Sequence, residues 1–411
     1  MIANWKKSAA LSESKTVVEK TTAVKIVSVQ TLGLTRSRPL ARPSRAFGFA
    51  EFLSPFPKRL KCPGTNPLTN AQAALRFQIR TLRGDGFIDG SSSCAVSSSM
   101  ATKAQFPAEQ SAEGEFVRQD DAFRDWLSAD GSTPHPFAAG RYHLYVSLAC
   151  PWACRTLIVR KLKGLKEVVG VTVVDPIRDE RGWMFRDGPG CTTDPVNGFA
   201  FLREAYTTTN PAYQGRVTVP VLWDKAAPRI VNNSEDDICR MFNAFGALGN
   251  PAVDLFPRDI ETEHSRLAKF IYENVNNGVY RAGFADTQRA YEKAFHRLFA
   301  ALDKLDQRLA TQRYLFGARI VEADWRLFCT LVRFDAVYYG HFKCNLRRIM
   351  DYPNLHGYLL DLYQQPSIAD TVNFDHIKRH YYFTHDDINP TRIVPVGPAL
   401  DFTRAHGRER L

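Results

Sequence analysis

The first clear pattern of hydrophobic and polar positions along the chain lies between residues 141 and 176. A segment rich in β-branched and aromatic residues (141–148) predicts a strand, and the helical pattern that follows (151–164) ends at Gly164, as a helix C-terminus should. A continuous apolar run (167–176) then predicts a second strand, of the kind that is buried on both faces of a sheet. The three segments form a βαβ unit.

A second group of strands follows a long polar loop (176–213). Two short apolar segments (216–224 and 229–233) predict strands, and a helix is expected to begin close to Ser234. The order βαβ followed by ββα is that of a thioredoxin-like domain. We assign this domain to residues 109–257.

Helical periodicity replaces the strand patterns after about residue 258. Apolar residues recur three and four positions apart in four long stretches, at 260–280, 287–310, 324–340 and 354–365. The fold class is therefore α/β plus all-α, with an all-helical substrate domain at 258–372. The remaining residues, 373–411, are polar, aromatic and rich in proline, and we expect an extension that packs on the surface.

The N-terminal region differs in composition from the rest of the chain. Residues 1–100 hold 15 Lys and Arg against 5 Asp and Glu, with many Ser and Pro, whereas the rest of the chain holds 39 against 38. We interpret residues 1–108 as a disordered leader, which resembles a transit peptide. A plain disordered tail, or a true start at Met100, stays open. The expected location is cytoplasmic, or a plastid or mitochondrion if the leader is a transit peptide.

Charge, hydropathy and cysteine content exclude several classes of protein. The formal charge of +11 comes from the leader and not from a folded face, so nucleic acid is not an expected partner. The chain has no run of about 18 apolar residues, so no membrane partner is expected. Eight cysteines without a C-x2-C pair predict neither a disulfide scaffold nor a metal site.

Candidate chemistry begins where the first strand turns into the first helix, at "LACPWAC". Pro151 suits the first helical position, which places Cys150 at or beside the N-cap. Free backbone N–H groups and the helix dipole would then stabilise a thiolate and lower the pKa of Cys150. Cys154 lies one helical turn further on. We interpret it as structural, with a resolving thiol as the alternative.

Two further segments fit a site around Cys150. Proline inside the strand "VTVPVLWD" is disfavoured unless the chain bends there, and in thioredoxin-type folds a cis-proline stands opposite the active cysteine. Val219 and Pro220 fit that role. At the later helix start, Ser234 or Glu235 would accept an ammonium group, while free N–H groups receive a carboxylate. Ser234 and Asp237 also fit an ordinary capping box.

These segments resemble one known family. The stretches "YHLYVSLACPWA", "GRVTVPVLWDK", "NNGVYRAGFA", "RFDAVYYGHFKCN" and "INPTRIVPVGP" are similar to the glutathionyl-hydroquinone reductases, the Xi class of glutathione transferases, which are related to the Omega class. The resemblance spans roughly residues 109–398. Cys-Pro-Trp and the Tyr-rich segment before HFKCN are specific to this class.

The resemblance implies a reaction, a co-substrate and a set of residues. Glutathione is the co-substrate, and the Cys150 thiolate attacks the sulfur of a glutathionyl-hydroquinone, leaving a mixed disulfide that a second glutathione resolves. Tyr280 and Tyr338 match tyrosines that polarise the phenol oxygens, with Tyr339 a less certain third. Trp183 matches a tryptophan that packs on glutathione. The resemblance also implies a homodimer. It leaves Arg203 and Arg216 as alternative partners of the glycyl carboxylate.

Three positions depart from the family pattern. Cys154 stands where the family usually has His, and Ser234-Glu235 where it has Glu-Ser. Val321 replaces a Thr N-cap, a change that costs about 1 kcal/mol and that Asp324 would partly offset. Two alternative functions stay open: Omega-like thiol transfer, including dehydroascorbate reduction, and a non-catalytic glutathione-binding module.

Overall fold

The computed structural model describes residues 109–411. The predicted leader at 1–108, with Cys62, Cys94 and Met100, therefore lies outside the described residues. The boundaries proposed at 257 and 372 stay predictions.

A four-stranded sheet forms the first half of the described chain. Its order is β2-β1-β3-β4, in which β1 is central, β2 runs parallel to it and the other strands are antiparallel. The strands are β1 (Tyr142–Val146), β2 (Gly170–Val173), β3 (Val221–Asp224) and β4 (Arg229–Asn232). Leu144 of β1 pairs with Val171 on one side and Leu222 on the other. Every residue of β1 is buried, as its alternating aromatic and branched residues suggest.

The apolar run at 167–176 was misread in one respect. Its strand, β2, lies at the edge of the sheet, and Val171 and Val173 are only half-buried. An edge strand has one side open to solvent, and β2 has only β1 beside it. Its apolar side chains pack against the core without being enclosed by it.

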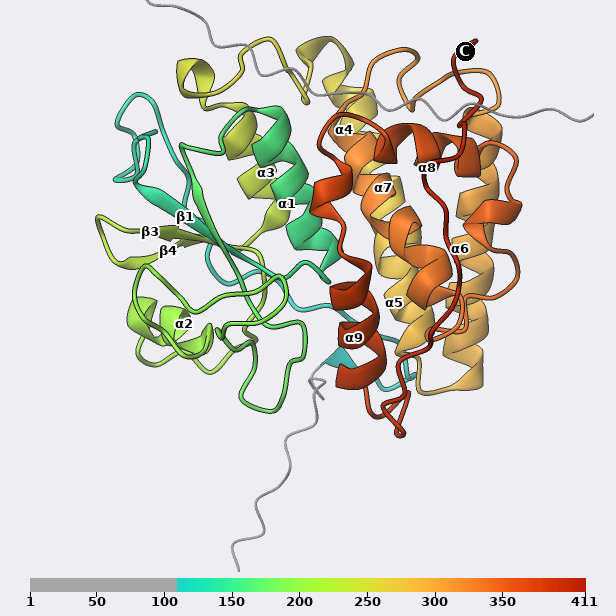
Figure 1. Cartoon of the computed structure of the whole chain (residues 1–411), viewed down its shortest axis with the longest axis horizontal. Coiled ribbons are helices and arrows are strands. Elements are labelled where there is room, and N and C mark those ends of the chain that lie inside the picture. Colours follow the sequence, from blue (N-terminus) through green and yellow to red (C-terminus); the bar gives the residue numbers. More distant parts are fainter. Residues whose placement is uncertain (1–108) are drawn as a thin grey trace, which may run out of the picture. The chain divides into compact units, whose positions relative to one another are not determined.

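Helices cover both faces of the sheet. Helices α1 (Pro151–Leu162) and α3 (Glu235–Asn243) lie together on one face, and α2 (Arg203–Thr209) lies on the other (Figure 1). Gly164 follows α1 with φ of +67°, the left-handed conformation expected after a helix end. Helix α2 lies inside the segment predicted as a loop, because its seven residues are too few for a clear helical period.

The second half of the described chain is helical, which confirms the predicted fold class of a thioredoxin-like domain followed by a helical domain. Its α-helices are α4 (Glu261–Ile271), α5 (Asn277–Gly283), α6 (Gln288–Arg308), α7 (Glu322–Arg333), α8 (Leu355–Tyr363) and α9 (Phe374–Thr384). Short 3₁₀ turns occur at Gly246–Leu248, Arg258–Ile260, Ile349–Asp351 and Ala369–Thr371. All residues of α7 are buried, so this helix forms the centre of the helical half.

Two π-helical turns interrupt this half. Tyr272–Asn276 (η4) joins α4 to α5, and Phe334–Tyr338 (η5) continues α7. The first turn is followed by α5, which contains Tyr280, and the second turn ends at Tyr338. Turns of this kind contain one residue more than an α-helical turn and are frequent at functional sites.

The segment after residue 373 is more than a surface extension. It contains α9, which buries His376, His380 and Tyr381. The ring nitrogens of His376 and His380 lie 2.6 Å and 2.7 Å from the carbonyl oxygens of Pro189 and Pro176, in the loop after β2. Helix α9 therefore joins the sheet-bearing half to the helical half (Figure 1).

A buried ion cluster connects three helices. Arg155 of α1 bonds to Glu322 of α7 and to Asp236 of α3, and Arg326 of α7 binds the same two carboxylates. Both arginines and Glu322 are buried, whereas the Asp236 side chain is about half exposed, so water screens only that edge of the cluster. The position of α1 against α3 and α7 depends on this cluster.

We expect Glu322→Gln to lower the free energy of unfolding by about 3 kcal/mol, because it leaves two buried guanidinium groups with one carboxylate fewer. Chemical denaturation of the full chain measures the change. The matched control is Asp259→Asn, which breaks the exposed Arg319–Asp259 pair and should cost less than about 1 kcal/mol. Equal effects in the two variants would mean that the cluster does not hold the helices together.

Candidate active site

The turn between β1 and α1 places Cys150 as the sequence predicts. Cys150 is the N-cap of α1, with extended backbone (φ −74°, ψ 124°), and Pro151 is the first helical residue. The Cys150 sulfur accepts a hydrogen bond from the Ala153 N–H at 3.5 Å. The prediction that this sulfur caps the helix is confirmed.

The predicted effect of this position on the thiol is wrong. Burial raises the pKa of the Cys150 thiol to about 11, although the Ala153 N–H and the charge of Arg333 act in the opposite direction. The helix terminus supplies less stabilisation to a thiolate than the loss of water removes. Cys150 therefore carries its proton at neutral pH.

Val219 and Pro220 lie opposite the cysteine. The peptide bond between them is cis, and the Cys150 S–H donates to the Val219 carbonyl oxygen at 3.5 Å. Pro220 ends the irregular segment before β3, so the strand begins only after it. Val219 lines the cavity beside Cys150, and Pro220 is buried behind it.

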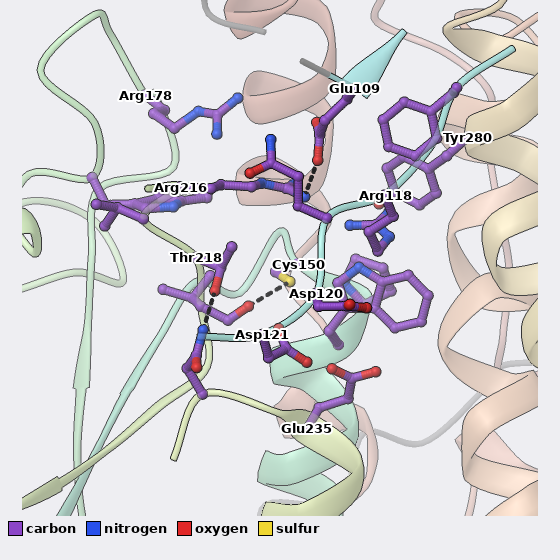
Figure 2. A pocket seen from close by; sticks show the side chains of 18 of the residues that line it. Glu109, Arg118, Asp120, Asp121, Cys150, Arg178, Arg216, Thr218, Glu235 and Tyr280 are labelled. Carbon is purple, nitrogen blue, oxygen red and sulfur yellow. Dashed lines mark hydrogen bonds and ion pairs between the residues drawn. The ribbon is translucent and has the colours of Figure 1, made fainter. Parts of the chain in front are cut away.

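A cavity of about 250 Å³ opens around Cys150 between the two halves of the described chain. Its walls carry charges of both signs, including Glu109 and Arg118, and two groups of these charges lie apart. Figure 2 shows Arg178 and Arg216 on one side of Cys150, and Asp121 and Glu235 on the other. The cavity therefore suits an extended molecule with a cationic group at one end and an anionic group at the other.

The acidic end contains one predicted residue and one that was missed. Glu235 lines the cavity at the start of α3, while Ser234 is buried and lies outside the lining. Asp121, from the segment before β1, lies close enough to Glu235 for their charges to interact. Burial and the Glu235 charge raise the pKa of Asp121 to about 7, although Arg124 and Arg118, which also line the cavity, act in the opposite direction.

The basic end surrounds Trp183. This tryptophan lines the cavity, stacks on His380 with ring centroids 5.0 Å apart, and has the Arg178 guanidinium 5.6 Å from its ring centre. Arg216 also lines the cavity and bonds to Glu109 at 2.5 Å. Arg203, the other candidate for a carboxylate, lies in α2 and is not part of the cavity wall.

Phenol groups form the wall on the helical side. The Tyr280 hydroxyl lies 2.5 Å from that of Tyr381, which lies 2.9 Å from that of Tyr338. Tyr280 and Tyr381 line the cavity, whereas Tyr338 is fully buried behind them and Tyr339 is outside the lining. Burial raises the pKa of all three bonded tyrosines, so they stay neutral proton donors.

Comparisons with known proteins agree with this arrangement. Family models of the glutathione S-transferase N-terminal and C-terminal domains match residues 149–244 and 288–360. The chain is 52% identical over 309 residues to the glutathionyl-hydroquinone reductase YqjG of Escherichia coli, a match that covers 73% of this chain and 94% of the relative. This chain belongs to the glutathionyl-hydroquinone reductase family, the Xi class of glutathione transferases.

Other members of the reductase family give similar matches. PcpF of Sphingobium chlorophenolicum, also a glutathionyl-hydroquinone reductase, is 50% identical over 71% of this chain and 92% of its own. The glutathione-bound structure of YqjG superposes with a TM-score of 0.69 over 70% of this chain and 96% of that one. The Xi-class transferase of Natrialba magadii gives a TM-score of 0.69 at 51% identity, over 70% and 89%.

The departures from the reductase family pattern have local explanations. Cys154 is buried and donates to the Thr371 carbonyl oxygen at 3.5 Å, away from the cavity. The Val321 N–H donates to the Asp324 carboxylate at 2.9 Å, which partly offsets the missing Thr cap, although the Val321 side chain makes no capping bond.

The capping box considered for Ser234 and Asp237 does not form. The Ser234 side chain makes no capping bond, and Asp237 pairs with Arg124 instead. Glu235 stands at the position where the reductase family pattern has Ser, and its carboxylate oxygen lies 3.1 Å from the Arg155 guanidinium.

The sequence did not reveal several residues that line this reductase-family cavity. The most important are Asp121, His380 and Tyr381. Asp121 follows the weakly patterned start of the domain, and the other two lie on α9, in the segment predicted to cover the surface. The apolar spacing of Ile377 and Tyr381, four residues apart, was the available signal for that helix.

The described residues contain no group of three or more His, Cys, Asp or Glu side chains that would hold a metal ion. Among the same residues, no helix is long and apolar enough to cross a membrane.

We expect the rate at which iodoacetamide alkylates Cys150 to rise about tenfold per pH unit between pH 7 and 9.5, because only the thiolate reacts and the pKa lies above this range. Peptide mapping of the full chain measures the rate at Cys150 itself. A plateau below pH 8 would show that the helix terminus outweighs burial.

Proposed function

We propose that this protein is a glutathione-dependent enzyme that reduces glutathionyl-hydroquinones to hydroquinones through a Cys150–glutathione mixed disulfide. The observation that carries this proposal is one cavity that holds a capping cysteine and a bonded set of neutral phenols. Simple thiol–disulfide exchange would need only the cysteine. The phenols suit a substrate that must also accept a proton on an aromatic ring.

The charges at the two ends of the cavity fit glutathione. The γ-glutamyl end of glutathione carries an ammonium group, which suits Glu235 and Asp121. Its glycyl end carries a carboxylate, which suits Arg178 and Arg216 beside Trp183. Between them, the Val219 backbone would bind the cysteinyl part, as an extended peptide binds a strand edge. A relative in this family, YqjG, has a glutathione-bound structure.

In the first step the Cys150 sulfur attacks the thioether sulfur of the substrate. The S–S bond forms, the C–S bond breaks and its electron pair moves to the ring, so the sulfur is oxidised and the ring reduced. The proton lost by the Cys150 thiol balances the proton gained by the ring carbon. The step therefore needs no outside acid or base overall.

In the second step a free glutathione attacks the mixed disulfide. The Cys150 sulfur leaves and regains a proton, and oxidised glutathione is released, in an ordinary thiol–disulfide exchange. The products are one hydroquinone, one oxidised glutathione and the original enzyme.

The phenols act only in the first step. Tyr280 and Tyr381 would donate hydrogen bonds to the oxygens of the hydroquinone ring, where charge develops as the C–S electrons arrive. Tyr338 does not reach the cavity surface and supports Tyr381 through their hydrogen bond. This assigns Tyr338 a less direct role than the sequence suggested.

Two other functions remain as alternatives. Omega-like thiol transfer or dehydroascorbate reduction would use Cys150 without the phenols. A non-catalytic glutathione-binding module would need neither Cys150 nor the phenols. The homodimer, the cellular location and the absence of a nucleic acid partner stay predictions.

The direct test is the intact mass of the full chain after incubation with a glutathionyl-hydroquinone and no free glutathione. We expect the wild type to gain one glutathionyl group, about 305 Da, and to release one equivalent of hydroquinone, because the mixed disulfide cannot be resolved. Cys150→Ser should do neither, and the matched control Cys154→Ser should behave as the wild type. A wild type without adduct or hydroquinone would favour the binding module.

The tyrosines separate quinol reduction from simple thiol transfer. We expect Tyr280→Phe and Tyr381→Phe each to lower kcat/KM for a glutathionyl-hydroquinone by about 100-fold, because each removes a hydrogen-bond donor to the ring oxygens. Activity on hydroxyethyl-glutathione disulfide should change less than about threefold, since that substrate has no ring oxygens on which charge develops. Tyr339→Phe, outside the cavity wall, is the control. Equal losses on both substrates would support the Omega-like alternative.

A further inference from the structure

Arg333 lies directly beneath the turn that carries Cys150. It is the last residue of α7 and is fully buried. Its guanidinium donates to the carbonyl oxygens of Ala149 at 2.9 Å and Leu148 at 3.1 Å, and a longer contact of 3.5 Å reaches that of Cys150. One side chain from the helical half therefore holds three consecutive carbonyls of the turn in the other half.

The charge of Arg333 is not neutralised by a carboxylate. Its remaining hydrogen bond goes to the Cys329 carbonyl at 2.9 Å, and within residues 109–411 no Asp or Glu forms an ion pair with it. Carbonyl oxygens carry only partial charge, so a full positive charge remains in a region without water. The other buried arginines, Arg155 and Arg326, differ because both bind Glu322 and Asp236.

Arg333 faces the buried thiols of Cys154 and Cys329 as well as groups on which negative charge would develop in the reaction. Cys150 begins α1 above its bonded carbonyls, and Tyr338 lies five residues further along the chain, in η5. The charge of Arg333 lowers the pKa of Cys150 and acts in the same direction on Tyr338 and Tyr381. A buried cation without a carboxylate partner would stabilise negative charge on both the Cys150 sulfur and the phenol oxygens.

We infer that Arg333 is a positioning residue of the reaction: its buried guanidinium fixes the turn before Cys150 and supplies the positive charge that stabilises the Cys150 thiolate. This inference rests on the proposed role of Cys150 as the nucleophile. Other charged groups also act on the sulfur. Glu235 on α3 opposes the thiolate, and Arg178 and Arg216 interact with it from the loops that line the basic end.

The test separates the charge of Arg333 from its hydrogen bonds. Arg333→Gln keeps N–H donors without the charge, whereas Arg333→Lys keeps the charge with a different set of donors. The measured quantity is the rate at which iodoacetamide alkylates Cys150 in the full chain at pH 8.5, mapped to the Cys150 peptide. Below the thiol pKa this rate is proportional to the thiolate fraction.

We expect the Gln variant to react about tenfold more slowly than the wild type, which corresponds to a thiol pKa about one unit higher. The Lys variant should stay within about threefold of the wild type, because the cation remains. The matched control is Arg326→Lys, a buried arginine on the same helix whose partners are carboxylates. It should affect the thermal midpoint of unfolding but change the alkylation rate less than about twofold.

Two outcomes would overturn the inference. One is a folded Gln variant that reacts as fast as the wild type, and the other is an equal loss in the Gln and Lys variants, which would reduce Arg333 to a structural residue. If the Gln variant does not fold, a tenfold loss in the Lys variant alone contradicts a role of the charge. Because alkylation involves no quinol, these results remain decisive even if the wild type fails to reduce a glutathionyl-hydroquinone.

Discussion

The buried cluster of Arg155, Arg326, Asp236 and Glu322 is the interaction on which the rest of the structure depends. It fixes the starts of α3 and α7 against the middle of α1. The first residues of α1 and α3 also line the cavity around Cys150, so the cluster lies next to the site without forming its wall. Buried ion pairs of this kind add little net stability, but they are costly to leave incomplete, which favours one arrangement of the helices over others.

Local patterns were sufficient to predict most of the elements and the position of Cys150. Pro151, Gly164 and the strand before them act over a few residues, so their meaning is contained in the sequence around them. The pKa of Cys150 is different. It depends on how much water the opposite wall excludes, and that wall includes Tyr381 and other residues far from Cys150 in the sequence.

The lining residues that the sequence did not predict were missed for the same reason, because their positions depend on contacts between distant segments. Asp121 and Tyr381 come from the two ends of the described chain and meet the other walls only in the folded protein. Neither stands in a motif with fixed spacing to Cys150. The edge position of β2 is a similar case, because an apolar run gives the composition of a strand but not the number of its neighbours.

The two π-helical turns affect how this site can change. Each residue in an α-helix turns the next side chain by about 100°, so the one additional residue in Tyr272–Asn276 or Phe334–Tyr338 reorients everything that follows in its helix. The orientation of Tyr280 thus depends on chain length upstream of it as much as on its own identity. An insertion or deletion in either helix would therefore change the direction in which its tyrosine points, even where the tyrosine itself is retained.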